Sequence, residues 1–165
     1  MARIKVKPAR VFSILFVCTG NICRSPMAEY TLKAKLAARG LQRVRVASAG
    51  TIGGRIPQSP DEAVIAASRK GVNLGLHESR RLDQAMVDEA DLIVAMDSDH
   101  KKKLLEKFTG LKNKLVLLTD FRRDKLGGES IPDPYGLDQL FYDKVFVMID
   151  ESLDDMVEWL VKGKA

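Results

Sequence analysis

The sequence predicts an α/β fold in which four parallel strands form a twisted sheet between two layers of helices. Two observations lead to this prediction. Short apolar runs rich in β-branched residues alternate along the chain with longer segments of helical periodicity, an alternation typical of parallel βαβ units. The run at 91–96 is apolar at nearly every position, as expected for a strand buried on both faces of a parallel sheet.

The first strand is expected at 11–17, where the sequence is apolar and partly β-branched or aromatic. An eight-residue loop at 18–25, called the Cys18 loop below, follows it. Ser25 is a good N-cap and Pro26 suits the first helical position. We therefore expect a helix from about 26 to 39.

A second strand is expected at 44–47, followed by a flexible loop at 48–54 that is rich in glycine. The next helix is expected to start with a capping box formed by Ser59 and Glu62 and to run to Gly71.

The second half of the chain repeats the alternation of helices and apolar strands. Asp97 is expected to act mainly as the cap of its helix, and the loop at 119–136 is long enough to suggest a functional role. The expected elements are a short helix at 83–89, a strand at 91–96, a helix at about 98–108, a strand at 115–118 and a final helix at about 137–162.

The size and composition are those of one globular domain. The chain has 165 residues, of which 45% are hydrophobic and 30% are charged. We expect a single domain, 1–165, in which residues 1–10 form a flexible, basic leader. No apolar run approaches the ~20 residues of a membrane span, and the leader lacks the features of a signal peptide. The net charge of +5 suits an anionic substrate but is too dispersed to indicate nucleic acid. We therefore expect neither a membrane nor a nucleic-acid partner.

The Cys18 loop has the composition of a phosphate site. Cys18 stands where the strand ends, and Arg24 follows six residues later where the helix begins. Loop amides and a helix N-terminus favour an anion, and a guanidinium matches two oxygens of a phosphate. Thiols at such positions are acidified, so the loop favours a thiolate nucleophile. The loop lacks the Gly-Lys-Ser/Thr ending of a Walker loop, and it does not match the glycine fingerprint of a Rossmann fold.

Only two cysteines are present, Cys18 and Cys23, five positions apart in one loop. A disulfide-stapled secreted domain would join distant segments, so we expect a reducing, cytoplasmic compartment. Two thiols without a nearby histidine make an incomplete zinc site. We expect neither a metal nor another cofactor.

A second site residue is expected in the loop after the fourth strand. Asp133 lies between two prolines and is followed by Tyr135; the prolines restrict the backbone and pre-position the carboxyl. Because ligands bind at the carboxyl ends of parallel strands, this loop, the Cys18 loop and the loop at 48–54 are expected to converge. Cys18 would attack phosphorus, and Asp133 would protonate the leaving group and then activate water.

The run Cys18-Thr19-Gly20-Asn21-Ile22-Cys23-Arg24-Ser25-Pro26, together with Asp133-Pro134-Tyr135, closely resembles the low-molecular-weight protein tyrosine phosphatases. The likeness spans about residues 11–162. It implies a flavodoxin-like fold, a phosphorylated protein substrate and a cysteinyl-phosphate mechanism with Cys18 as nucleophile, Arg24 as phosphate clamp and Asp133 as general acid. The chain is expected to be a monomer that can self-associate weakly. It also implies that Ser25 hydrogen-bonds the thiolate. The residues expected to contact the substrate are Thr19, Gly20, Asn21, Ile22, Cys23 and Tyr135.

The resemblance further implies that Asn21 holds the loop in a left-handed turn and is tied to Ser48 and His77. By the same resemblance, Cys23 can form a reversible disulfide with Cys18. A small packing residue is the alternative interpretation of Cys23, and we expect His77 to be a structural hydrogen-bonding residue rather than a base.

The chain departs from the family pattern around the expected cleft. Bulky aromatic residues are missing after the second strand and at Gly136, so Tyr135 and Ile52 are the expected walls. The Asp-Pro-Tyr-Gly ending resembles the bacterial protein-arginine phosphatase branch, which typically has threonine where this chain has Ile22. Isoleucine offers no hydroxyl and crowds a guanidinium, so phosphotyrosine is the expected substrate. Arsenate reductases share the loop but need two further cysteines, which are absent after Cys23. A phosphate-binding module without turnover is the remaining alternative.

Overall fold

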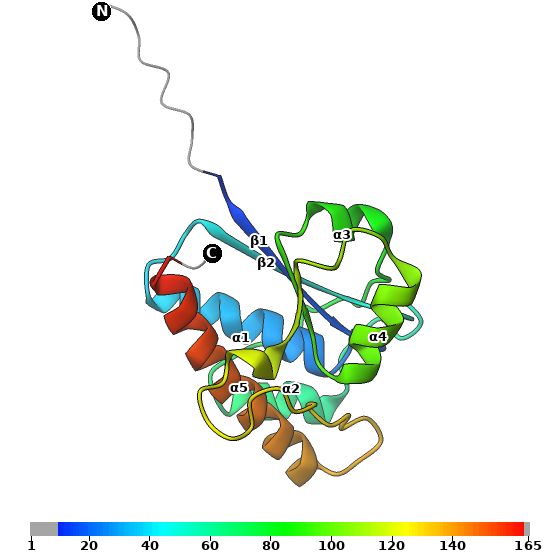
Figure 1. Cartoon of the computed structure of the whole chain (residues 1–165). Helices are drawn as coiled ribbons and strands as arrows, with labels where there is room; N and C mark the ends of the chain where they lie inside the picture. Colours follow the sequence, from blue (N-terminus) through cyan, green and yellow to red (C-terminus); the bar gives the residue numbers. More distant parts are fainter. Residues whose placement is uncertain (1–9, 164–165) are drawn as a thin grey trace, which may run out of the picture.

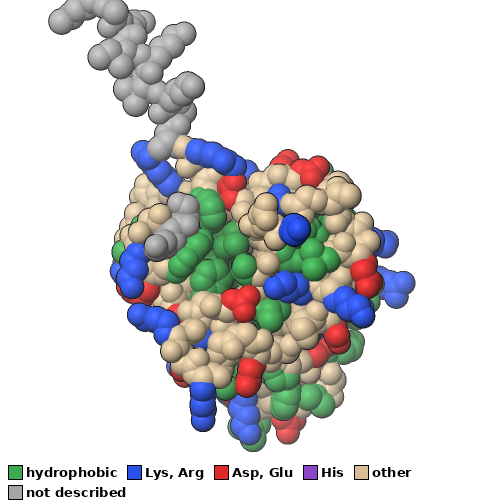
Figure 2. Space-filling model, viewed as in Figure 1, with side chains coloured by type: hydrophobic (Ala, Val, Ile, Leu, Met, Phe, Trp, Pro, Cys, Tyr) green, Lys and Arg blue, Asp and Glu red, His purple; other side chains and the backbone are tan. Residues whose placement is uncertain are grey.

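The protein is described by a computed structural model that covers residues 10–163. Of the basic leader predicted at 1–10, all but Arg10 lies outside the described residues. Within the described range, no helix is both long and apolar enough to cross a membrane. Basic and acidic side chains are interspersed over the face seen in Figure 2 and do not gather into one basic patch.

Four parallel strands form a single sheet, as the sequence predicts. Their order is β2-β1-β3-β4, the flavodoxin-like arrangement in which β1 lies between β2 and β3. Because the direction of winding reverses at β1, a ligand crevice is expected at the carboxyl end of this strand. The strands are β1 (Phe12–Cys18), β2 (Val44–Gly50), β3 (Leu92–Ala95) and β4 (Leu115–Leu117).

Helices cover both faces of the sheet (Figure 1). One layer contains α1 (Arg24–Ala38), α2 (Asp61–Ser68) and α5 (Gln139–Val161), with α5 packed against both α1 and α2. The other layer contains α3 (Gln84–Glu89) and α4 (Ser98–Lys107), which contact β1, β3 and β4. A 3₁₀ helix, Leu118–Phe121, opens the long loop that was predicted at 119–136.

Two hydrophobic cores flank the sheet because side chains alternate along each strand. In β1, Ile14 and Phe16 join the core beneath α1 and α5, whereas Leu15 and Val17 join the core beneath α3 and α4. Burying each such side chain contributes about 1.5–3 kcal/mol. The continuous apolar runs in the sequence therefore correspond to strands that are buried on both faces.

The predicted start of the first helix is wrong by two residues. α1 begins at Arg24, its N-cap is Cys23, and no side chain caps it. Ser25 does not act as the cap, because its hydroxyl lies 2.9 Å from the sulfur of Cys18 and accepts a hydrogen bond from Asn21. The serine is therefore used by the loop and not by the helix end.

The capping box predicted at Ser59 and Glu62 is also wrong. Pro60 occupies the N-cap of α2 with an extended backbone, and no side chain caps this helix. The helix thus starts one residue later than the box requires, and the buried hydroxyl of Ser59 has no hydrogen-bond partner among the described residues. α2 also ends at Ser68 rather than Gly71. The expected cap at Asp97 is confirmed, since its carboxylate accepts a hydrogen bond from the backbone of His100.

Candidate active site

A cleft of about 310 Å³ opens at the carboxyl ends of β1 and β2. The Cys18 loop forms its floor, and the segments that follow β2 and precede α5 form its walls. Cys18, Arg24 and Asp133, which the sequence analysis selected from distant parts of the chain, all line it. The other lining residues are Thr19, Gly20, Ile22, Cys23, Ile52, Arg55, Ile56 and Tyr135.

Cys18 is the last residue of β1, and the whole residue is 3% exposed. Its Sγ atom is 2.9 Å from Oγ of Ser25, and the side-chain amide of Asn21 donates to the same Oγ at 2.9 Å. Because Ser25 accepts from Asn21, its own hydroxyl hydrogen is available to donate to Cys18. This arrangement stabilises negative charge on the sulfur, as expected for Ser25.

Asn21 has a φ of 56°, the only positive value at a non-glycine residue in the described range. Asparagine tolerates this left-handed conformation better than most residues. Its Nδ2 donates to Oγ of Ser48 at 2.8 Å, and Nε2 of His77 donates to its carbonyl at 2.7 Å. The expected ties to Ser48 and His77 are therefore present. The structure adds Arg80, whose backbone N–H donates to Oδ1 of Asn21 at 2.9 Å.

The end of β2 presses directly against the Cys18 loop. A Cβ atom added at Gly50 would lie 2.5 Å from the carbonyl oxygen of Thr19, so a larger residue cannot fit without moving the loop. The following residues hold the loop by backbone hydrogen bonds, from Thr51 to the carbonyl of Cys18 and from Ile52 to that of Thr19, both at 3.0 Å. β2 is longer than predicted because its pairing with β1 continues to Cys18 and Gly50.

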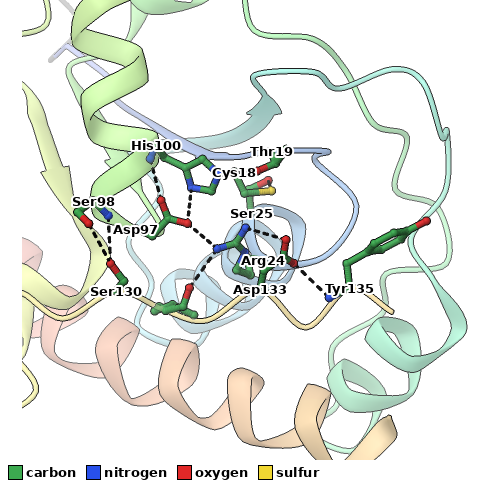
Figure 3. A network of polar contacts seen from close by, with 11 residues as sticks. Cys18, Thr19, Arg24, Ser25, Asp97, Ser98, His100, Ser130, Asp133 and Tyr135 are labelled. Atoms are coloured by element: carbon green, nitrogen blue, oxygen red, sulfur yellow. Dashed lines mark hydrogen bonds and ion pairs between the residues drawn. The ribbon is translucent and has the colours of Figure 1, made fainter. Parts of the chain in front are cut away.

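Arg24 is a buried cation that two carboxylates face (Figure 3). Its side chain is 3% exposed, and Nη1 donates to Oδ2 of Asp97 at 2.8 Å and to the carbonyl of Ile131 at 3.0 Å. Nη2 lies 3.4 Å from Oδ2 of Asp133. These contacts orient the guanidinium at the floor of the cleft, where two N–H groups of a planar fork can meet phosphate oxygens.

Asp97 does more than cap α4, contrary to the main expectation from the sequence. One carboxylate oxygen accepts from the backbone of His100 at 2.7 Å, while the other holds Arg24. Burial opposes ionisation of Asp97, but the backbone hydrogen bond from His100 and the hydrogen bond and charge of Arg24 outweigh it, so the pKa of this carboxyl is lowered. Asp97 lies two residues after the end of β3, and only the neighbouring position of β1 and β3 brings it to Arg24.

Asp133 stands at the mouth of the cleft with its side chain 53% exposed. Its Oδ1 accepts a hydrogen bond from the backbone of Tyr135 at 3.1 Å, which holds the carboxylate over the cleft. The backbone N–H of Ile131 donates to the carbonyl of Met96 at 2.8 Å and anchors the preceding residues to the end of β3. An exposed acid on an anchored loop can reach the leaving group of a bound substrate and the water that follows it.

Cys23 is buried beside Tyr142, with its sulfur 3.5 Å from the phenolic oxygen. Burial raises the pKa of this thiol to about 12, although the hydrogen bond to Tyr142 opposes the shift. Both cysteines are free. The redox and packing interpretations of Cys23 therefore both stay open.

The walls of the cleft are partly those that the sequence predicted. Ile22, Ile52 and Tyr135 line it, whereas Arg55 and Ile56 were missed. Their signal was their position directly after the glycine-rich loop that was expected at the mouth of the site. Within residues 10–163, no group of three or more His, Cys, Asp or Glu side chains is placed to hold a metal ion.

His100 was also missed by the sequence analysis. Its side chain lies within 2.6 Å of Thr19 and 3.1 Å of Asp97. The available signal was its position three residues after the cap residue of α4, which places it on the helix turn that faces the Cys18 loop.

Comparison with protein families matches residues 13–165 to the family described as low molecular weight phosphotyrosine protein phosphatase. A curated relative from Acinetobacter johnsonii, a low molecular weight protein-tyrosine-phosphatase, is 37% identical over 144 residues, covering 87% of this chain and 94% of the relative. A protein-arginine-phosphatase from Bacillus subtilis is 32% identical over 151 residues, covering 92% of this chain and 98% of the relative.

Solved structures of tyrosine and arginine phosphatases are also similar to this chain. A low molecular weight phosphotyrosine phosphatase from Vibrio cholerae superposes with a TM-score of 0.83 at 32% identity, covering 92% of this chain and 99% of that one. A cysteine-to-serine mutant of the YwlE arginine phosphatase, with a phosphorylated active-site serine, superposes with a TM-score of 0.84 at 31% identity, covering 92% and 97%. Vibrio vulnificus Wzb in complex with benzylphosphonate superposes with a TM-score of 0.79 at 28% identity, covering 90% and 98%.

Proposed function

The chain belongs to the low molecular weight phosphotyrosine protein phosphatase family, and from this premise we propose that it hydrolyses phosphotyrosine in proteins through a cysteinyl phosphate at Cys18. One observation carries the proposal: a single cleft is lined by a cysteine, an arginine and an aspartate in the positions that this chemistry requires. The cysteine is on the floor, the arginine beside it and the aspartate at the mouth.

In the first step, the thiolate of Cys18 attacks phosphorus and forms a P–S bond while the bond from phosphorus to the phenolic oxygen breaks. Arg24 and the loop amides stabilise the charge on the three equatorial oxygens. Asp133 donates its proton to the departing phenolate. The hydroxyl of Ser25, 2.9 Å from the sulfur, stabilises the thiolate before attack.

In the second step, water attacks phosphorus and the P–S bond breaks. Asp133, now ionised, accepts the proton of the water, so the same carboxyl serves as acid and then as base. The products are inorganic phosphate and the regenerated Cys18 thiolate. The related YwlE structure, whose active-site serine is phosphorylated, supports a phosphoenzyme at this position of the fold.

The shape of the cleft supports an aryl phosphate as substrate. Ile52, Ile56 and Tyr135 are 46%, 47% and 56% exposed and line the opening above the Cys18 loop. Apolar and aromatic walls of this kind bury the ring of a phosphotyrosine and leave its phosphate to the polar floor. The related Wzb structure is in complex with benzylphosphonate, an aryl ligand of comparable shape.

Two variants test the proposal. Cys18→Ser should abolish steady-state turnover of p-nitrophenyl phosphate. Asp133→Asn should lower kcat/KM, which reports the first step alone, by about 10²–10⁴-fold for phenyl phosphate, whose leaving group needs a proton, and by less for p-nitrophenyl phosphate. Glu129→Gln is the matched control, because Glu129 is an exposed acid in the same loop. Activity that survives in Cys18→Ser would refute the covalent mechanism, and an equal loss of kcat/KM on both substrates would remove Asp133 as the acid.

Protein-arginine phosphatase activity is the second candidate function. The 32% identity to a protein-arginine-phosphatase over almost the whole chain favours it. Ile22 favours phosphotyrosine: it lines the cleft, is 6% exposed and has no hydroxyl to offer a phosphoguanidinium. Phosphotyrosine and phosphoarginine peptides should be compared on the wild type and on Ile22→Thr. A wild-type preference for phosphoarginine would overturn the assignment.

We also propose that residues 1–165 act as one monomeric domain in the cytoplasm. One sheet with a hydrophobic core on each face supports a single domain, and two free cysteines suit a reducing compartment. Sedimentation equilibrium should give the mass of one chain.

A further inference from the structure

His100 is a buried polar side chain that the proposed mechanism does not use. It lies in the first turn of α4, and the residue is 3% exposed. Its Nε2 atom is 2.6 Å from Oγ1 of Thr19, and its Nδ1 atom is 3.1 Å from Oδ2 of Asp97 (Figure 3). The second contact lies outside hydrogen-bond alignment and is electrostatic. The imidazole thus bridges the residue after Cys18 and the carboxylate that holds Arg24.

The surroundings determine which nitrogen carries the proton. A neutral imidazole has one donor and one acceptor, and a carboxylate only accepts. The Asp97 carboxylate beside Nδ1 favours the proton on that nitrogen, which leaves Nε2 as the acceptor. The hydroxyl of Thr19 therefore donates to Nε2. Burial lowers the pKa of His100 and favours this neutral form.

The topology makes this bridge structurally important. The pairing of β1 with β3 ends at Val17 and Ala95, so strand hydrogen bonds do not hold the Cys18 loop on the α4 side. Beyond that point, the described residues connect the loop to the first turn of α4 at two places. Thr19 is bound to His100 at the start of the loop, and Arg24 is bound to Asp97 at its end.

We propose that His100 is a positioning residue that joins Thr19 to Asp97 and so fixes the position of Cys18 relative to the guanidinium of Arg24. The inference rests on the proposed function and adds a residue to it. In-line attack requires the sulfur and the clamp to contact one phosphoryl group, so a displacement of about 1 Å between them costs up to about 10²-fold in rate. His100 touches neither the substrate nor the reacting atoms and acts through the two residues that it joins.

A double-mutant cycle tests the proposal. Thr19→Val removes the hydroxyl from a half-buried loop position, and His100→Leu removes the imidazole. Each should lower kcat for p-nitrophenyl phosphate about tenfold, with KM changed less than about twofold, since a lost hydrogen bond is worth about one factor of ten. The double variant should lose about tenfold and not a hundredfold, because both changes break the same connection.

Conservative variants and a second readout separate positioning from loss of folding. Thr19→Ser keeps the hydroxyl and should retain most of the activity that Thr19→Val loses. His100→Gln keeps a group that can accept from this hydroxyl and should retain most of the activity that His100→Leu loses. The inhibition constant of orthovanadate should rise in parallel with the fall in kcat, while the melting temperature of Thr19→Val falls by only roughly 3–6 °C, so that the variant is folded in the assay.

The possible failures are distinct. Independent, multiplicative losses in the cycle, or an unchanged kcat in Thr19→Val, would overturn the role of His100 while the wild type remains an active phosphatase. A wild type without phosphatase activity, or activity retained in Cys18→Ser, would overturn the proposed function itself.

Discussion

Replacing Asp97 by asparagine separates its two structural roles. Asparagine caps a helix as well as aspartate does, so the hydrogen bond to the backbone of His100 can be kept. The negative charge that faces Arg24 is lost. Any large effect of Asp97→Asn on stability therefore reports the contacts of the charged carboxylate, chiefly the ion pair with Arg24 and also the contact with Nδ1 of His100, and not the end of α4.

The structure sets the size of the expected effect. The Arg24 side chain is 3% exposed and the Asp97 side chain is 20% exposed, with 2.8 Å between Nη1 and Oδ2. Removing one partner of a buried pair costs about 3–5 kcal/mol. Arg24 keeps the carbonyl of Ile131 at 3.0 Å and Asp133 at 3.4 Å, so the low end applies. We expect the free energy of unfolding to fall by about 3 kcal/mol and the melting temperature by roughly 6–12 °C.

The assay is urea unfolding at pH 7.5, followed by circular dichroism, with an unchanged m value as the sign that only stability has changed. Asp99→Asn is the matched control. Asp99 lies in the same first turn of α4, is exposed and has no ion pair among the described residues, so its loss should be below about 1 kcal/mol. If Asp97→Asn loses no more stability than Asp99→Asn, the assignment of Asp97 as the anchor of Arg24 is wrong.

Three further predictions concern pH, substrate sequence and oxidation. Burial lowers the pKa of His100 from 6.5, so its contribution to stability is complete above pH 6.5 and is lost as the pH falls through the lowered pKa. The unfolding free energies of the wild type and His100→Gln should therefore converge as the pH falls below 6.5, and parallel curves would contradict this. Arg55 is exposed in the cleft and has no ion pair among the described residues. Arg55→Glu should raise KM about three- to tenfold for acidic phosphotyrosine peptides but not for basic ones. An equal change in KM for both kinds of peptide would exclude a contact between Arg55 and acidic residues of the substrate. Burial raises the pKa of Cys23 to about 12, so its thiolate fraction increases about tenfold from pH 7 to 8. The attack of Cys23 on oxidised Cys18, which forms the disulfide, should accelerate by the same factor. A rate of disulfide formation, followed by mass spectrometry, that is independent of pH would count against Cys23 as the attacking thiol.

Local sequence patterns predicted the elements well and selected three residues, Cys18, Arg24 and Asp133, that line one cleft. The alternation of apolar runs and helical segments reports burial on both faces of a parallel sheet, and that burial depends on each strand's own side chains. Cys18 and Arg24 lie within one loop, so their spacing can be read directly from the chain. Asp133 could be selected because two prolines and an aromatic residue mark its segment, although it is more than a hundred residues away.

The errors arose where a local signal competed with a tertiary contact. Ser25 has the composition of a cap but serves the sulfur of Cys18, and Ser59 lies one residue too far from the start of α2. Asp97 was correctly expected to cap its helix, yet its second oxygen binds a guanidinium from another element. A cap can be recognised from adjacent residues, whereas a competing partner from a distant segment cannot.

The sequence by itself therefore determined the strand and helix segments, the parallel α/β class and the chemistry of the Cys18 loop, because each depends on residues close together in the chain. Only the tertiary structure decided which groups surround that chemistry. The strand order β2-β1-β3-β4 places β1 between two neighbours. Gly50 and Ile52 thereby reach the loop from one side, and Asp97 and His100 reach it from the other. Strand order depends on packing of the whole chain, which no single segment encodes.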